Sequence, residues 1–158
     1  MDKQKIIKKE TEELLKKMIN EFEIEIIEEG GIFQVIIKTD TEAPTVIGRY
    51  GETIRALQKI LEVILYKKLG EPVDILVNVN DYREKQKEKL ETLATEAAKK
   101  AKNENRPVYL NRLSSFERKI IHEYITDNFP ELTSYSVGEG RERKLVIEAK
   151  KEEKTNQT

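Results

Sequence analysis

Two of the seven glycines in this 158-residue chain stand three positions apart, at Gly48 and Gly51, directly before an apolar helical pattern. From Glu52 onward, apolar residues recur at helical spacing until Gly70 and Pro72 end the pattern. A G-x-x-G spacing before a helix predicts a tight turn, because glycine adopts backbone conformations that other residues avoid. The chain must therefore fold around a sharp turn at this point.

On either side of the turn, the spacing of apolar residues is helical in some segments and typical of strands in others. Helical spacing over residues 3–22 predicts an amphipathic helix. Two β-branched runs at 23–29 and 32–38, separated by a Gly-Gly pair, predict a hairpin. After the helix that begins at Glu52, residues 73–79 predict a strand. The first part of the chain is thus helix, strand, strand, short helix with glycine turn, helix and strand, ending near residue 80.

The second part begins with a long polar helix predicted over residues 82–103. A short strand in "RPVYL" follows, and Ser114 or Ser115 is placed to cap a helix that runs to about residue 128. Two further strands are predicted at 132–137 and 144–149, joined by the loop "GEGRER". The polar residues 151–158 are predicted to be a disordered tail.

Composition favours two thin cores over one large core, because the hydrophobic and charged fractions are both 37%. We therefore predict an α+β chain of two small domains, residues 1–80 and residues 81–150.

Several classes of chemistry are disfavoured by the residue types present. The chain has no Cys and a single His, which excludes disulfides, thiol catalysis and the usual zinc sites. The two serines before the second-domain helix are better explained as caps than as nucleophiles, and the carboxylate-rich stretches as solvated helix faces. We predict no enzyme activity, metal or cofactor. The absence of a long apolar run predicts a cytoplasmic protein without membrane insertion.

Positive charge gathers around the glycine turn, since residues 45–68 hold five basic and two acidic side chains. A turn without Cβ atoms lets the backbone approach a sugar-phosphate chain, and the first N–H groups of a helix attract phosphate. Val46 and Leu57, with the strand 73–79, are predicted to help line a groove for unstacked bases. The alternative is that the glycines only make a tight turn. The predicted RNA-binding residues here are Ile47, Gly48, Arg49, Tyr50, Gly51, Ile54 and Arg55.

The stretch "VIGRYGETIRALQKI" resembles the signature of a bacterial KH domain. Together with "RPVYLNRLSSFERKIIHEYI" and "TSYSVGEGRERKLVIE", it is similar to the Jag family of SpoIIIJ-associated RNA-binding proteins over about residues 20–150. The resemblance implies a KH-like α/β sandwich followed by an R-x-x-x-H (R-three-H) domain, in which helices pack on a three-stranded sheet. The separate N-terminal Jag domain of this family is not expected here.

In "ERKIIH", Arg118 and His122 are four residues apart, which places both on one face of a helix. The resemblance implies that this face binds single-stranded nucleic acid, with Lys119 and Arg143 as further contacts. Arg141 stands where this family usually has proline, so the loop departs from the family pattern at that position. For His122, a structural role within the domain is an equal alternative.

The sequence therefore predicts a non-enzymatic protein that binds single-stranded RNA. The resemblance further implies post-transcriptional regulation linked to cell elongation and division, alongside a small KH-domain partner protein. The alternatives are a single-stranded DNA ligand, a protein-interaction adaptor and, with the least support, a nuclease.

Overall fold

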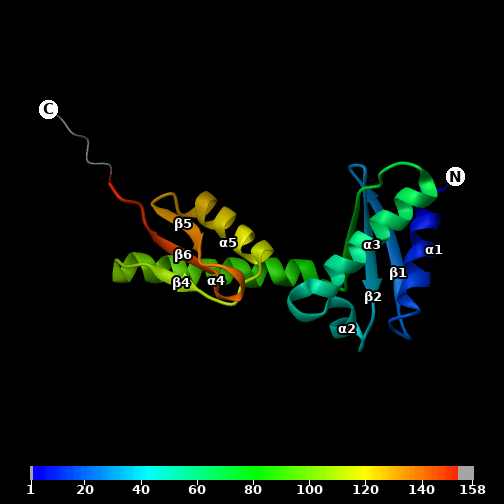
Figure 1. Cartoon of the computed structure of the whole chain (residues 1–158), viewed down its shortest axis with the longest axis horizontal. Coiled ribbons are helices and arrows are strands. Elements are labelled where there is room, and N and C mark those ends of the chain that lie inside the picture. The colour runs from blue at the N-terminus through cyan, green and yellow to red at the C-terminus, as the bar shows by residue number, and fades with distance from the viewer. Residues whose placement is uncertain (1, 153–158) are drawn as a thin grey trace. The chain divides into compact units, whose positions relative to one another are not determined.

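The computed structural model describes residues 2–152 and divides between Glu84 and Lys85 into two compact units (Figure 1). The structure confirms the prediction that the chain mixes helices and strands. The strands form two separate three-stranded sheets. Of the predicted tail, residues 153–158 lie outside the described part of the chain. No helix within residues 2–152 is both long and apolar enough to cross a membrane.

The first unit has the predicted order of elements. They are α1 (Lys3–Leu15), β1 (Glu23–Glu29), β2 (Ile32–Lys38), α2 (Ala43–Ile47), the 3-10 turn η1 (Arg49–Gly51), α3 (Glu52–Leu69) and β3 (Ile75–Val79). The sheet order is β1-β2-β3. β1 and β2 are antiparallel, and the two glycines between them both have positive φ, as a two-residue hairpin turn requires. β3 is parallel to β2, so the chain between them must cross over, and α2, η1 and α3 form this crossover.

Helix α1 is shorter than predicted, because it ends at Leu15 instead of continuing to residue 22. Residues 16–18 form turns, yet Met18 and Phe22 still pack against the core. Beyond the turns, the carboxylate of Glu42 accepts the N–H groups of Glu21 and Asn20, each at 2.9 Å. These two bonds hold the pKa of the Glu42 carboxyl below its usual range. The chain after α1 is thus held to the beginning of α2 by tertiary contacts.

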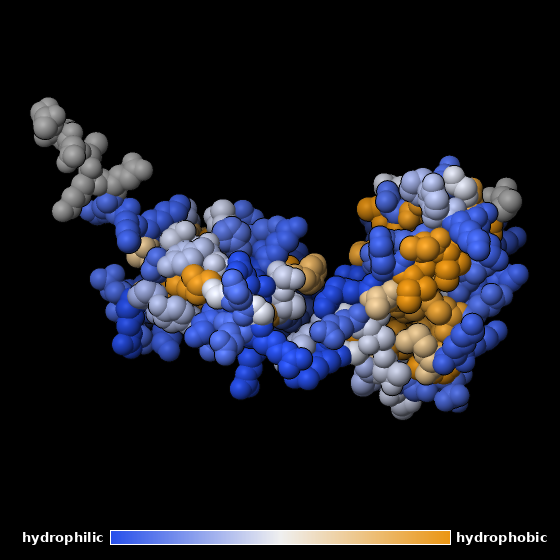
Figure 2. All heavy atoms as spheres, in the orientation of Figure 1, coloured by the Kyte–Doolittle hydropathy of each residue, from blue (hydrophilic) through white to orange (hydrophobic). Residues whose placement is uncertain are grey.

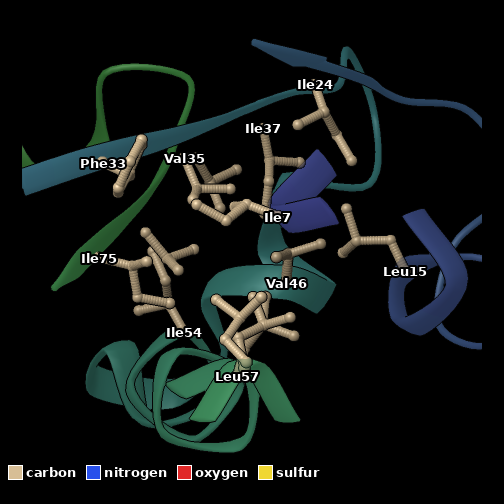
Figure 3. Packing of buried hydrophobic residues seen from close by; sticks show 14 of the residues in the cluster. Ile7, Leu15, Ile24, Phe33, Val35, Ile37, Val46, Ile54, Leu57 and Ile75 are labelled. Atoms are coloured by element: carbon tan, nitrogen blue, oxygen red, sulfur yellow. The ribbon is translucent and has the colours of Figure 1, made fainter. Parts of the chain in front are cut away.

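The core of the first unit lies between one face of the sheet and helices α1 and α3 (Figure 3). Alternate strand residues face it, and the register places Val35 beside Val77 and Ile37 beside Val79, all fully buried. Leu61 and Leu65 of α3 are also fully buried. The predicted stripe of α3 is wider than its buried face, since Ile60 is 48% exposed.

The second unit contains α4, β4 (Val108–Leu110), α5 (Ser115–Asn128), β5 (Leu132–Val137), the 3-10 turn η2 (Gly140–Glu142) and β6 (Lys144–Ala149). Helix α4 spans Tyr82–Glu104, so its first residues belong to the first unit. The sheet order is β4-β6-β5, and both pairings are antiparallel. Buried alanines of α4 and the fully buried Ile121 and Ile125 of α5 form the core with Leu145 and Ile147 of β6.

Helix α5 begins where the sequence predicted, and its first turn is closed by a capping box. The Ser114 hydroxyl accepts the Glu117 N–H at 3.1 Å, and the Glu117 carboxylate accepts the Ser114 N–H at 2.7 Å. This carboxylate also accepts a hydrogen bond from Gln86 at 2.8 Å, which links α5 to α4. Phe116, an apolar residue of this first turn, is 44% exposed.

Candidate nucleic-acid interface

The glycine turn, residues 47–51, adopts a conformation that its two glycines make possible. Gly48 has φ 72° and ψ 178°, a region that is essentially restricted to glycine. Gly51 is left-handed at φ 70°. A Cβ atom at Gly48 would overlap the Thr53 side chain, and one at Gly51 would lie 2.7 Å from the Tyr82 hydroxyl. The backbone conformation and the contact with Thr53 therefore require glycine at Gly48, and the left-handed backbone favours glycine at Gly51.

The N–H groups around the glycine turn are largely used within it. Gly48 donates to the Pro44 carbonyl at 2.9 Å and Gly51 to the Gly48 carbonyl at 3.2 Å, while the Glu52 N–H bonds to Arg49. The expectation of free N–H groups at the beginning of α3 does not hold for these three.

The exposed side chains of the turn are Arg49 and Tyr50. The Arg49 guanidinium lies 5.2 Å from the centre of the Tyr50 ring, and Tyr50 itself is left-handed at φ 55°. Arg55 donates to the Tyr50 carbonyl at 2.9 Å, which closes the turn from the α3 side. Ile47 is half-buried. The turn therefore presents one cation stacked on one aromatic ring, with a second cation behind it.

The sequence predicted an apolar groove beside the turn, but most of the residues predicted to line it are buried in the core. Val46, Ile54 and Leu57 are 0%, 2% and 3% exposed and belong to the core. The alternate residues of β3 also face the core. The side chain of Ile54 therefore cannot contact a base in this structure, because it packs beneath the sheet instead of beside the turn.

In the second unit, a hollow of about 540 Å³ brings together four side chains that the sequence analysis singled out. Arg118, Lys119 and His122 come from α5, and Arg143 comes from the end of the loop before β6. We call it the α5 hollow. Its other lining residues are Ser115, Ser134, Tyr135, Ser136 and Leu145. Among the described residues, every charged side chain that lines it is basic.

The two arginines of the α5 hollow are held by backbone carbonyls. Arg118 donates from Nη1 to the Leu113 carbonyl at 2.6 Å, and Arg143 donates from Nη1 to the Gly138 carbonyl at 2.7 Å. A guanidinium has five N–H donors in a fixed plane, so one bond orients each side chain and leaves other donors for a ligand. A planar, oriented donor fork suits the oxygen atoms of a phosphate.

His122 has one ring nitrogen committed to the fold. Its Nδ1 lies 2.6 Å from the hydroxyl of the buried Ser134 on β5, while the side chain as a whole is exposed. This contact orients the ring and directs Nε2 away from Ser134. The structural and the ligand-binding roles of His122 are therefore compatible. Lys119 is the least constrained member, since its side chain is 73% exposed and lies 4.0 Å from Glu123.

A second hollow of about 580 Å³ adjoins the first through Arg143. Sequence reasoning missed most of its residues, although the charges of "GEGRER" were a visible signal. It is lined by Tyr109, Asn111, Arg112, Val137, Gly138, Glu139, Arg141, Glu142, Arg143 and Lys144. Four of these side chains are basic and two are acidic. No group of three metal-ligating side chains occurs within residues 2–152.

Comparison with known families places the α5 hollow inside a recognised domain. The family model that matches is the R-three-H domain, over residues 88–149. This range includes every residue that lines the two hollows of the second unit.

Curated relatives extend the similarity beyond that domain. The chain is 33% identical over 114 residues to the RNA-binding protein KhpB of Bacillus subtilis, 32% over 111 residues to that of Lactiplantibacillus plantarum, and 34% over 113 residues to that of Streptococcus pneumoniae. These matches cover 72%, 70% and 71% of this chain. The chain spans 55%, 34% and 34% of the length of the three relatives.

Proposed function

From the R-three-H domain of the second unit and the similarity to KhpB proteins over most of the chain, we propose that this protein binds single-stranded RNA and catalyses no reaction. The observation that carries the proposal is the α5 hollow. It gathers Arg118, Lys119 and Arg143 around His122, with no carboxylate among its lining residues in the described part of the chain. Such a concentration of oriented donors favours a phosphate backbone.

We also propose that the first unit is a KH-like domain and that its glycine turn makes a second contact with RNA. The supporting features are the order of its elements, with the G-x-x-G turn between α2 and α3, and the exposed pair of Arg49 and Tyr50. In KH domains a GXXG loop clamps the nucleic-acid backbone. Two modest sites in one chain increase the joint affinity through effective concentration.

The proposal is tested by anisotropy titration of a labelled, mixed-sequence single-stranded RNA with the whole chain. Lys119→Glu and Arg49→Glu reverse one exposed charge at each proposed site. Lys100→Glu on α4 and Lys9→Glu on α1 make the same change at exposed positions that line neither hollow and lie outside the glycine turn. Because the charge change is matched, a general electrostatic effect would lower affinity in all four variants equally.

We expect Lys119→Glu and Arg49→Glu each to weaken binding about tenfold, and the two controls to stay within about twofold. Loss in Lys119→Glu alone would assign the RNA to the second unit and refute the contact at the glycine turn. Equal effects in all four variants would refute both sites. Absence of binding by wild-type protein at low salt would refute the function.

The salt dependence gives a second criterion. Phosphate contacts release counterions, and the logarithm of the association constant falls by about 0.7 per neutralised phosphate for each unit of log salt on a single strand. Lys119→Ala is therefore expected to reduce this slope by about 0.7. Competition with DNA of the same sequence decides between RNA and single-stranded DNA as the preferred ligand.

A protein-interaction adaptor is the second candidate function, and the outer surface of α3 favours it. Ile60, Val63 and Tyr66 are 48%, 60% and 57% exposed, and Figure 2 shows an apolar area on this unit. Exposed apolar side chains that gather in one area mark interaction surfaces. Binding through this surface would be nearly independent of salt, and Val63→Glu would abolish it while leaving RNA affinity unchanged.

The cellular role rests on the resemblance to the Jag family alone. We propose a cytoplasmic protein of post-transcriptional regulation linked to cell elongation and division, with a small KH-domain protein as partner. Co-purification from cells after crosslinking, followed by sequencing of the bound RNA, tests this role.

A further inference from the structure

The outer face of the second sheet carries two exposed tyrosines in one row. The register pairs Tyr109 of β4 with Val146 of β6, and Val146 with Tyr135 of β5. These three residues, which we call the tyrosine row, therefore point to the same side of the sheet. Tyr109 is 56% exposed and Tyr135 is 43% exposed.

Helices α4 and α5 pack on the opposite face of this sheet. The core residues of β5 and β6 are Leu132, Leu145 and Ile147, which alternate with the tyrosine row along the strands. Val146 is not part of this core, yet it is only 2% exposed. The two tyrosines flank it on the neighbouring strands. In Figure 2 a small apolar area lies on this unit, surrounded by pale residues.

Each ring makes one contact with a neighbouring charged side chain. The Tyr135 hydroxyl donates to Glu148 at 2.9 Å, and this bond raises the pKa of the phenol. The ammonium of Lys144 lies over the Tyr109 ring, 6.0 Å from its centre. Two inter-strand spacings separate the backbones of the two tyrosines by about 9.6 Å. This spacing lets each ring take a planar ligand of its own, and a base on the Lys144 side of Tyr109 would replace the ammonium of this exposed side chain.

Basic side chains surround this row at the end where the two hollows meet. Tyr135 also lines the α5 hollow, Tyr109 lines the second hollow, and Arg143 lines both. The row thus adjoins the α5 hollow through Tyr135 on the edge strand β5, and the second hollow through Tyr109, although α5 itself packs on the other face of the sheet. A flat aromatic surface beside a basic hollow fits a ligand with a charged backbone and planar, uncharged faces.

We propose that Tyr109 and Tyr135 stack on unpaired bases of single-stranded RNA whose phosphates lie in the α5 hollow. The proposal rests on the RNA-binding function above. It assigns base stacking to the sheet face, while the residues of α5 contact the phosphates. Bases have planar faces on both sides, and stacking on an aromatic ring does not depend on base identity. Aromatic side chains on an open sheet face bind bases in this manner in other folds. The carboxylate of Glu148 disfavours phosphate at this place and so favours the base.

The test compares a ring removal with a matched removal elsewhere. The double variant Tyr109→Leu with Tyr135→Leu keeps an apolar cover over Val146 but has no ring. The double Tyr→Phe variant keeps both rings and loses only the hydroxyls. Tyr66→Leu removes one ring from the first unit at a position 57% exposed, close to the 56% of Tyr109. Each is titrated with a mixed-sequence single-stranded RNA and with an RNA of the same length that carries abasic sites.

We expect the double Leu variant to bind the base-containing RNA at least tenfold more weakly than wild type, since a base–aromatic stack contributes about tenfold in affinity. The double Phe and Tyr66→Leu variants should stay within about twofold, and the abasic RNA should bind wild type and the double Leu variant equally. If the double Leu variant binds base-containing RNA as tightly as wild type, the stacking proposal is overturned while the RNA-binding function stands. If wild type binds neither RNA, the function fails first.

A measurement on the wild-type chain covers the case in which the Leu variant does not fold. RNA containing 4-thiouridine is crosslinked by long-wavelength light and the attached peptides are sequenced. Crosslinks on Tyr109 or Tyr135 support the proposal. Crosslinks confined to peptides outside β4 and β5 overturn it.

Discussion

Replacing Gly48 by alanine should destabilise the first unit more than replacing any glycine that lies in open space. The backbone at Gly48 has φ 72° and ψ 178°, and holding a residue with a Cβ there costs about 1–3 kcal/mol. The added Cβ would also lie 2.7 Å from the Thr53 Cβ and closer still to its hydroxyl, and overpacking of this kind costs about 1–3 kcal/mol. We therefore expect a loss of about 3 kcal/mol or more in the free energy of unfolding.

Gly30 is the matched control. It also has positive φ, 60°, but a Cβ there would meet nothing within 4 Å. Gly30→Ala should therefore lower the free energy of unfolding by about 1 kcal/mol, the cost of a left-handed backbone at a residue with a Cβ. The free energies are measured by urea unfolding followed through amide NMR signals of β1 to β3, so that the transition belongs to the first unit. With a slope of about 1 kcal/mol/M for a small unit, the Gly48→Ala midpoint should fall by about 3 M.

A double-mutant cycle isolates the steric part of this cost. Thr53→Gly removes both side-chain atoms that the new Cβ would meet. In the Thr53→Gly background, Gly48→Ala should therefore lower the free energy of unfolding by about 1–2 kcal/mol less than it does in the wild-type background. If Gly48→Ala costs no more than Gly30→Ala, or if the cycle shows no coupling, the reasoning about this turn is refuted.

Three other perturbations test the remaining fold. Ser114→Ala should lower the stability of the second unit by about 1 kcal/mol through loss of the cap on α5, while Ser115→Ala stays within about 0.5 kcal/mol, both by urea unfolding. Ile121→Ala, at a fully buried position, should cost about 2–5 kcal/mol in the same assay. Because the folded pKa of Glu42 lies below its ordinary value of 4.5, its contribution is present above that pH and lost as the pH falls through the folded pKa. Glu42→Gln should therefore be less stable than wild type near pH 7, and thermal melts should show the difference vanish in acid.

Local signals in the sequence predicted most of the fold. The strand bounds 23–29 and 32–38 agree with the structure, because alternating β-branched residues and a Gly-Gly pair fix both the strands and their register. The end of α1 was missed because Met18 continues the helical spacing but reaches the core from a turn. Ile60 shows the same limit, since periodicity predicts which face is apolar but not how much of it finds a partner.

The proposed RNA contacts depend on long-range geometry to very different degrees. Arg118 and His122 share a face because they are four residues apart on one helix, which the sequence alone dictates. The burial of Ile54 could not be read from its position beside the turn, because it depends on where the sheet packs. Tyr109 and Tyr135 lie in one row only because β6 pairs between β4 and β5, and no local pattern encodes that order.

The two glycines of the turn are weak evidence for a ligand, because the fold itself accounts for them. Gly48 and Gly51 each occupy a conformation that a Cβ would strain, so glycine would be favoured there even in a chain that bound nothing. Side chains that the fold does not require are stronger evidence for a ligand. Lys119 is mostly exposed and, within residues 2–152, makes one long ion pair, and Tyr109 is more than half exposed. Exposed groups of complementary chemistry that adjoin one another are best explained by what they bind, and this places the strongest case for RNA on the second unit.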